Sequence, residues 1–302
     1  MLSVTEKIIF IVLTVTCIGA SFFTFTKMFR VIGLGKDPID WKKVVRNWKV
    51  GVDTFISQKT LFKTRPVVGF IHALVAWGFS LYLFVNIIDV LYGLIPNFKF
   101  LPNHFIGDIY RVFVDIFTVL VLLGVIYFLI RRFVLKDKRL QINTPVMISD
   151  SALKGMRFDS LLVGSFIILH VGSRFLSASF EIAGSHPDWS QPAANLVAKI
   201  WIGMDYNTII IMEHITWWLA LGLILLFLPY FPYSKHAHLF MGPLNIMAKT
   251  DRKSMAALEK IDFEDDDVEQ FGAAQIEHLP QTQLLDGYAC IQCSRCQDAC
   301  PA

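Results

Sequence analysis

Long runs of apolar residues alternate with charged stretches along this chain of 302 residues. Five runs are long enough to cross a membrane, because a helix needs about 20 apolar residues to span the hydrocarbon core. The predicted spans are Ile8–Phe25, Val67–Tyr92, Ile109–Ile130, Phe158–Ser179 and Thr208–Phe231. The pattern predicts an all-α membrane protein built on a bundle of five transmembrane helices.

The composition agrees with a membrane protein. Hydrophobic residues make up 54% of the chain and charged residues 18%, and the mean hydropathy is +0.52. The first span is not interpreted as a cleaved signal peptide, because Lys27 and Arg30 follow it and no small-x-small cleavage site is present. Cys17 lacks the neighbours of a lipoprotein site and is interpreted as a buried thiol. A transporter or channel would need more charges within the spans than this chain has.

The distribution of basic residues predicts the orientation. The loop from Lys27 to Arg65 holds ten basic residues, and the loop from Arg131 to Arg157 holds seven. The loops on the opposite side hold only Lys7, Lys99 and Lys199. Under the positive-inside rule the N-terminus lies outside the cell inner membrane and the C-terminus lies in the cytoplasm. Cysteines near the C-terminus are then in a reducing compartment, where metal binding is favoured over disulfides.

Two stretches outside the spans have patterns of their own. In DWKKVVRNWKVGVDTF, at residues 40–55, apolar residues recur at helical spacing with basic residues between them. This pattern predicts a helix on the inner membrane surface, with a solvated connector as the alternative. Residues 249–285 are charged, include the acidic run 264–267, and are predicted to form a cytoplasmic linker.

Four cysteines near the C-terminus follow the spacing C-x2-C-x2-C-x3-C-P: Cys290, Cys293, Cys296 and Cys300. This spacing is typical of a 4Fe-4S cluster, whereas a zinc site more often uses two separated cysteine pairs. In two-cluster ferredoxins the fourth cysteine ligates the other cluster, so the first three need a further ligand. Residues 286–302 are therefore expected to begin a ferredoxin-type 4Fe-4S domain that is incomplete here, completed by a longer polypeptide or by a partner.

Histidines within the spans add a second indication of redox chemistry. Polar residues inside a membrane are costly and usually functional. His72, His170 and His214 lie in three predicted spans, and His236 and His238 follow the fifth. Together with the cysteine motif, they predict b-type haem, whose iron takes two axial imidazoles.

The depth of each histidine predicts how they pair. At 1.5 Å per residue, His170 and His214 both fall roughly 8 to 14 Å from the outer edge, where they can share an outer haem. His72 falls roughly 8 Å from the inner edge. Its partner is then one of the two histidines after the fifth span, which requires a tilted span or a bend at Pro229 and Pro232.

The stretch FPYSKHAHLFMGPLN, residues 231–245, is similar to the segment that closes the last helix of the nitrate reductase gamma subunit, a five-span cytochrome b with two haems. This resemblance implies that His238 is the inner haem ligand and that His236 is a bystander. That family takes two ligands from the second span, ten residues apart. Here Tyr82 stands at the second position and His170 lies in the fourth span, so the outer site departs from the family pattern.

The stretch LLDGYACIQCSRCQDACPA, together with the membrane domain before it, resembles fused membrane iron-sulfur oxidoreductases related to the heterodisulfide reductase catalytic subunit. Some of these are electron-transfer-flavoprotein:menaquinone oxidoreductases. In that family the chain continues into a second ferredoxin motif and cysteine-rich domains, so the resemblance implies a truncated sequence. The implied domains are a dihaem cytochrome b at 1–248, the linker at 249–285 and the start of the 4Fe-4S domain at 286–302.

Several other polar residues are candidate site residues. Arg174, Glu213 and Asp89 lie near the predicted outer haem and are expected either to contact a haem propionate or quinone or to be polar residues at helix ends. Three further histidines are expected at the surface: His104, His186 and His278.

These features predict a protein that moves electrons from a cytoplasmic donor, such as electron-transfer flavoprotein, through 4Fe-4S clusters and two haem b groups to menaquinone. The cofactors carry the redox chemistry, and the protein sets their distance and potential. The alternative is a cytochrome b anchor subunit for a separate iron-sulfur chain. Lipid, quinone and the donor protein are the expected partners, and nucleic acid is not.

Overall fold

The computed structural model describes residues 2–98, 100–101, 104–141, 148–249, 263–264 and 272–299. Within these residues the chain is helical, and the only β pairing described is an isolated bridge between Lys36 and Pro280. The chain divides into two units. The first comprises Met1–Ala20, Thr60–Pro229 and Cys293–Ala302, and the second comprises Ser21–Lys59 and Tyr230–Gln292.

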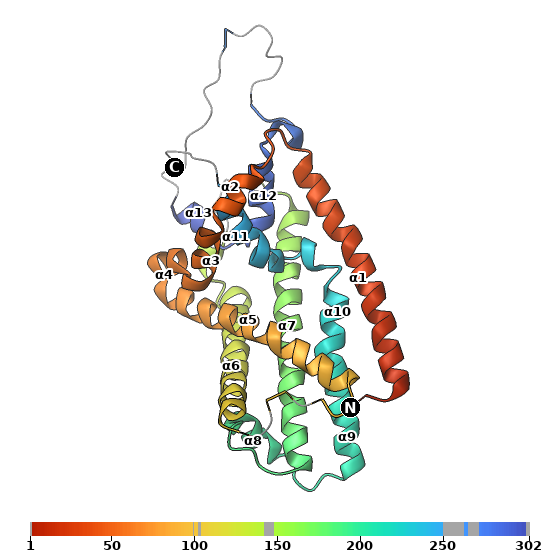
Figure 1. Cartoon of the computed structure of the whole chain (residues 1–302). Helices are drawn as coiled ribbons and strands as arrows, with labels where there is room; N and C mark the ends of the chain where they lie inside the picture. The colour runs from red at the N-terminus through yellow and green to blue at the C-terminus, as the bar shows by residue number, and fades with distance from the viewer. Residues whose placement is uncertain are drawn as a thin grey trace. The chain divides into compact units, whose positions relative to one another are not determined.

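Five helices in the described residues are long and apolar enough to cross a membrane, which confirms the predicted spans. The first, second and fourth spans are α1, α5 and α7 (Figure 1). The third span is α6 with the π-helix η1 that follows it, and the fifth consists of α9, the π-helix η3 and α10. Their bounds are α1 Val4–Gly33, α5 Pro66–Leu94, α6 Phe105–Leu129, η1 Ile130–Val134, α7 Asp150–Gly184, α9 Tyr206–Trp217, η3 Trp218–Gly222 and α10 Leu223–Phe227. The fifth helix ends four residues before the predicted Phe231, because Pro229 cannot continue a helix.

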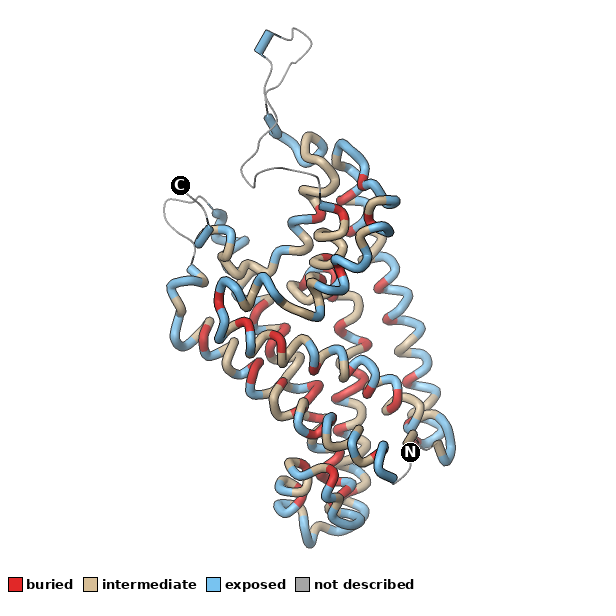
Figure 2. The backbone as a smooth tube through the Cα atoms, turned by 60° about the vertical axis from the view of Figure 1, so that its left-hand side comes forward, coloured by how far each residue is buried: buried red, intermediate tan, exposed pale blue. Residues whose placement is uncertain are grey.

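In the first unit, α7 packs against α6, α9 and the short helix α8 (Pro192–Ala198), while α5 packs against α6 (Figure 1). A cluster of buried side chains joins α5, α6 and α7: Tyr82, Val121, Val125 and Val171. Only 17% to 33% of the most apolar part of each span is buried, and exposed positions run along every helix (Figure 2). Large apolar residues at those positions suit a hydrocarbon surrounding rather than water.

A buried carboxylate on α6 holds α8 in place. The two oxygens of Asp115 accept the backbone N–H groups of Ala193 and Ala194 at 2.7 and 3.0 Å. These N–H groups belong to the first turn of α8, where no intrahelical acceptor is available. Pro192 at the first helical position suits the same turn, because it has no N–H to satisfy.

The second unit is built from two stretches that are far apart in the sequence. Here α2 (Trp41–Arg46) and α3 (Trp48–Ser57) pack against α11 (His238–Ala248), and α11 packs against α12 (Gln281–Ala289). Asn47 separates α2 from α3, and its side chain donates to the carbonyl of Met247 at 3.1 Å. The stretch predicted as one surface helix is therefore two helices. Their exposed apolar side chains, among them Trp41 and Trp48, are compatible with the predicted membrane surface.

Part of the predicted linker lies within the described residues. Residues 272–285 include the 3-10 turn η6 (Ile276–His278) and the first half of α12, so helix begins inside the stretch that was expected to be a linker. The acidic residues Asp265, Asp266 and Asp267 lie outside the described residues. The remaining short elements are α4 Lys59–Thr64, η2 Lys138–Leu140, η4 Phe231–Tyr233, η5 Lys235–Ala237 and α13 Arg295–Asp298.

Close packing of α5 on α6 depends on a glycine. A Cβ atom added at Gly124 would lie 2.6 Å from the Cγ2 atom of Val75, which is closer than a real contact allows. We expect Gly124→Ala to lower the free energy of unfolding by about 1–3 kcal/mol, because a β-branched neighbour cannot yield. Thermal unfolding in detergent measures this.

Gly172→Ala is the matched control, because no atom lies within 4 Å of the added Cβ. We expect it to leave the unfolding temperature unchanged or raise it, since alanine favours helix. An unfolding temperature for Gly124→Ala equal to that of the unsubstituted protein would contradict the packing described.

Candidate functional site

Cys290 and Cys293 lie between α12 and α13, and Cys296 lies within α13. Cys290 and Cys296 are exposed, Cys293 is partly buried, and Cys300 falls outside the described residues. Gln292 and Ser294 take left-handed backbone conformations, with φ of 55° and 60°. The backbone N–H of Gln292 donates to the Sγ atom of Cys290 at 3.4 Å.

This loop fits an iron-sulfur cluster in its backbone and in its donors. Left-handed residues turn N–H groups inward into anion-binding concavities, which many iron-sulfur sites use. An N–H bond to a cysteine sulfur is one of the contacts that tune such clusters. Among the described residues, which do not include Cys300, no group of three or more His, Cys, Asp or Glu side chains could hold a metal ion.

His170 is buried at the meeting of α5, α7 and the π-helix η3, with 6% of its surface exposed. Its Nδ1–H donates to the carbonyl oxygen of Ala220 at 2.7 Å, and its Nε2 lies 3.4 Å from the Nδ2 atom of Asn86. The ring also stacks on Phe166 and meets Tyr82 edge-on. The bond to Ala220 fixes the tautomer, so Nε2 carries the lone pair, as in metal-binding histidines.

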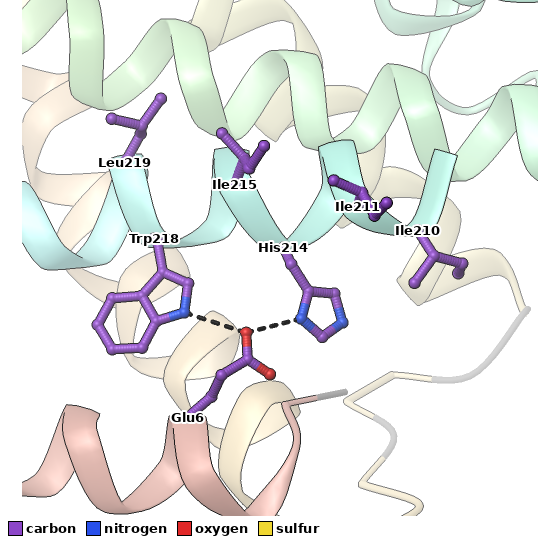
Figure 3. Close-up of a pocket in the computed structure, with 7 residues that line it drawn as sticks. All are labelled: Glu6, Ile210, Ile211, His214, Ile215, Trp218 and Leu219. Carbon is purple, nitrogen blue, oxygen red and sulfur yellow. Dashed lines mark hydrogen bonds and ion pairs between the residues drawn. The ribbon is translucent and has the colours of Figure 1, made fainter. Parts of the chain in front are cut away.

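His214 lies in a pocket between α9 and α1 (Figure 3). Its Nδ1–H donates to the Oε1 atom of Glu6 at 2.8 Å, and the indole N–H of Trp218 reaches the same oxygen at 3.2 Å. The second carboxylate oxygen of Glu6 accepts the backbone N–H and the hydroxyl of Ser3.

The pocket has a volume of about 450 Å³, and its other lining residues are aliphatic: Ile210, Ile211, Ile215 and Leu219. Its one ionisable pair, Glu6 and His214, is 23% and 28% exposed. Sites for organic ligands are usually mostly apolar pockets with few polar groups. A haem and a quinone ring are both ligands of this kind. Glu6 was not identified from the sequence, because an acid in the first turn of a helix is normally attributed to the helix dipole.

In the structure, His170 and His214 have different hydrogen-bond partners. His170 bonds to Ala220, which is six residues beyond His214, or about 9 Å along a helix. His214 turns instead toward Glu6 on α1 (Figure 3). The shared outer haem therefore stays a prediction.

His72 and His238 belong to different units, so their pairing also stays a prediction. His72 lies on α5, with its ring edge-on to Phe128. His238 begins α11, and its Nδ1–H donates to the carbonyl of Lys235 at 2.5 Å. Burial lowers the pKa of His238, and burial with a smaller effect of His238 lowers the pKa of His236 to about 4. Both imidazoles are therefore neutral at pH 7, as a metal ligand must be.

Two of the remaining predicted site residues, Arg174 and Asp89, form an ion pair with each other. The Nε atom of Arg174 pairs with the carboxylate of Asp89 at 3.2 Å, and Trp217 donates to the Asp89 carbonyl. Glu213 is partly buried on α9. Of the histidines expected at the surface, His104 and His186 are exposed and His278 is partly exposed.

Two curated proteins are similar to nearly the whole chain. The probable iron-sulfur-binding oxidoreductase FadF of Bacillus subtilis is 32% identical over 303 residues, which cover 99% of this chain and 40% of that protein. The EtfAB:quinone oxidoreductase of Syntrophomonas wolfei is 26% identical over 306 residues, which cover 98% of this chain and 40% of that protein. The chain thus spans about two fifths of the length of either relative. No family model and no solved structure matches the chain.

The carboxylate of Glu6 is expected to stabilise the α1–α9 contact. In Glu6→Leu the partly buried donors of His214 and Trp218 lose their acceptor, which should lower the free energy of unfolding by about 1–3 kcal/mol. Glu6→Gln is the matched comparison, because its amide oxygen can still accept, and we expect it to lose less than half as much. Thermal unfolding in detergent checks both; equal stability of all three proteins would show that this contact contributes nothing.

Proposed function

We propose that this chain is the membrane part of a quinone-linked iron-sulfur oxidoreductase. One observation carries the proposal: the chain aligns almost from end to end with two relatives, one named an iron-sulfur-binding oxidoreductase and the other an EtfAB:quinone oxidoreductase. The five membrane-crossing helices support a lipid-soluble substrate, and the cysteine spacing supports iron-sulfur chemistry.

Electrons enter, in this proposal, from a cytoplasmic donor such as electron-transfer flavoprotein and leave to menaquinone in the cell inner membrane. Cys290, Cys293, Cys296 and Cys300 would hold 4Fe-4S clusters, which supply one-electron transfer when bound. The direction of the helices follows from the basic loops, with the cysteines on the cytoplasmic side.

Two haem b groups complete the proposal, with ligands that the sequence predicts: His72 and His238 for the inner haem, His170 and His214 for the outer haem. The structure offers a common feature in support. The Nδ1 atom of three of them is bonded to a fixed acceptor: Ala220 for His170, Glu6 for His214 and Lys235 for His238. Such a bond orients the ring and directs Nε2 toward a metal.

Transfer from the flavoprotein to quinone tests the activity. The protein in detergent should catalyse reduction of a menaquinone analogue by reduced electron-transfer flavoprotein, followed by the absorbance of the quinone. Cys296→Ser should lower the rate at least tenfold, on the order of the loss from a changed metal ligand. Cys17→Ser, at a buried thiol outside the motif, is the control and should keep the rate. Equal rates for Cys296→Ser and the unsubstituted protein would refute a role for the motif.

A reduced-minus-oxidised optical spectrum, with haem counted per chain, tests the haem ligands. We expect two b haems in the unsubstituted protein and one in both His170→Ala and His214→Ala, because a lost axial imidazole releases its haem. His186→Ala, at an exposed position, should retain two. Two haems remaining in His170→Ala would assign His170 to the packing of α5, α7 and η3 alone.

A further inference from the structure

Arg65, directly before α5, is buried, with only 4% of its side chain exposed. A buried guanidinium is costly unless it is paired. Its Nη1 atom donates to the carbonyl oxygen of Cys293 at 2.8 Å, and its Nη2 atom pairs with the carboxylate of Asp298. One guanidinium therefore binds both ends of the segment 293–298, which carries two of the motif cysteines.

A second contact holds the same segment. The Nε2 atom of Gln297 donates to the carbonyl of Gln141, which follows η2, at 3.1 Å. All of these residues belong to the first unit, so the cysteine segment is bound to the loops at the ends of α5 and α6 within that unit.

Two buried donors at this loop have no partner. The Nε atoms of Arg65 and Arg295 are buried and make no hydrogen bond within the described part of the chain. An unpaired buried donor is destabilising, and native structures rarely leave one without a partner. Two cationic donors beside Cys293 and Cys296 suit an anionic group, and a cluster bound by thiolates is anionic.

The position of Arg65 along α5 connects this loop to the membrane bundle. His72 is seven residues further on, which is about two turns or 10 Å along the helix and on the same face. Arg65 thus stands between the cysteines and the first histidine predicted to bind haem.

We propose that Arg65 is a positioning residue that docks segment 293–298, with the iron-sulfur cluster it helps to hold, on the α5 end of the bundle and raises the reduction potential of that cluster. This inference rests on the proposed function. Arg65 serves a step in which one electron passes from the reduced cluster to an oxidised acceptor in the membrane domain. No bond is made or broken in this step. The fork of the guanidinium is required for docking, because a lysine ammonium cannot hold both acceptors in one plane.

The test compares Arg65→Gln, Arg65→Lys and Lys63→Gln in the purified protein. Lys63→Gln removes an exposed cation two residues away and is the matched control. Three readouts apply: the cluster potential by redox titration followed by electron paramagnetic resonance, hydrogen exchange of residues 293–299, and the rate of haem reduction after the cluster is reduced.

Arg65→Gln should lower the potential, speed the exchange and slow the haem reduction on the order of tenfold, the usual loss when a group supporting a metal ligand is removed. Arg65→Lys should keep the potential near that of the unsubstituted protein, because the charge remains, but should show fast exchange and slow haem reduction. Lys63→Gln should change none of the three. Unchanged potential, exchange and rate in Arg65→Gln would overturn the inference.

If Arg65→Gln fails to fold, judged by elution profile and haem content, Asp298→Asn replaces it. That variant retains the bond to Cys293 and loses the ion pair, so faster exchange of residues 293–299 is expected, and unchanged exchange would overturn the docking. Failure of the proposed function differs from failure of the Arg65 inference. In the first case the unsubstituted protein itself would show no cluster signal or would not pass electrons from cluster to haem.

Discussion

Pairing of polar groups inside an apolar bundle is the constraint on which the rest of this structure depends. Hydrocarbon offers no hydrogen-bond partner, so every polar side chain within a span must find one in the protein. Arg174 finds Asp89, and the hydroxyls of Tyr82 and Thr118 meet at 2.5 Å. Each of these pairs joins two different helices, so the polar residues also fix how the helices pack.

The same constraint joins the fifth span, through α9 and η3, to two neighbouring helices. On one side the carbonyl of Ala220, within the π-helix η3, accepts the N–H of His170 from α7. On the other side Glu6 of α1 accepts from His214 and Trp218 (Figure 3). A π-helical turn changes the register of the backbone and is frequent at functional sites. The fifth span is thus shaped by its polar contacts as much as by its apolar surface.

The same constraint acts on Arg65, which lies directly before α5 and outside the hydrocarbon. Its buried charge is matched by Asp298 and by the carbonyl of Cys293, residues that lie more than two hundred positions away in the sequence. That ion pair also fixes part of the cysteine loop, which is the proposed site of the iron-sulfur cluster. An exposed pair such as Lys59 with Asp53 has no comparable effect, since water solvates both partners.

The five spans followed from the sequence because hydrophobicity and helix length are local properties. The cysteine motif was recognisable for the same reason, since its ligands are close in sequence and their spacing is specific. Residue counts place His170 and His214 at similar depths, whereas the folded chain shows that their Nδ1 atoms bond to Ala220 and to Glu6, so the shared outer haem stays a prediction. Residue counts give the height of a side chain along its helix but not the direction in which it points.

The class of protein, the number of spans and the residue types available for redox chemistry are all readable from the order of amino acids. The partner of each polar side chain emerges only in the folded chain: Glu6 for His214, Ala220 for His170, Asp89 for Arg174 and Asp298 for Arg65. The reason is that each partner depends on how one helix is rotated against another. That rotation is set by packing between residues far apart in the chain, for which a single sequence has no local signal.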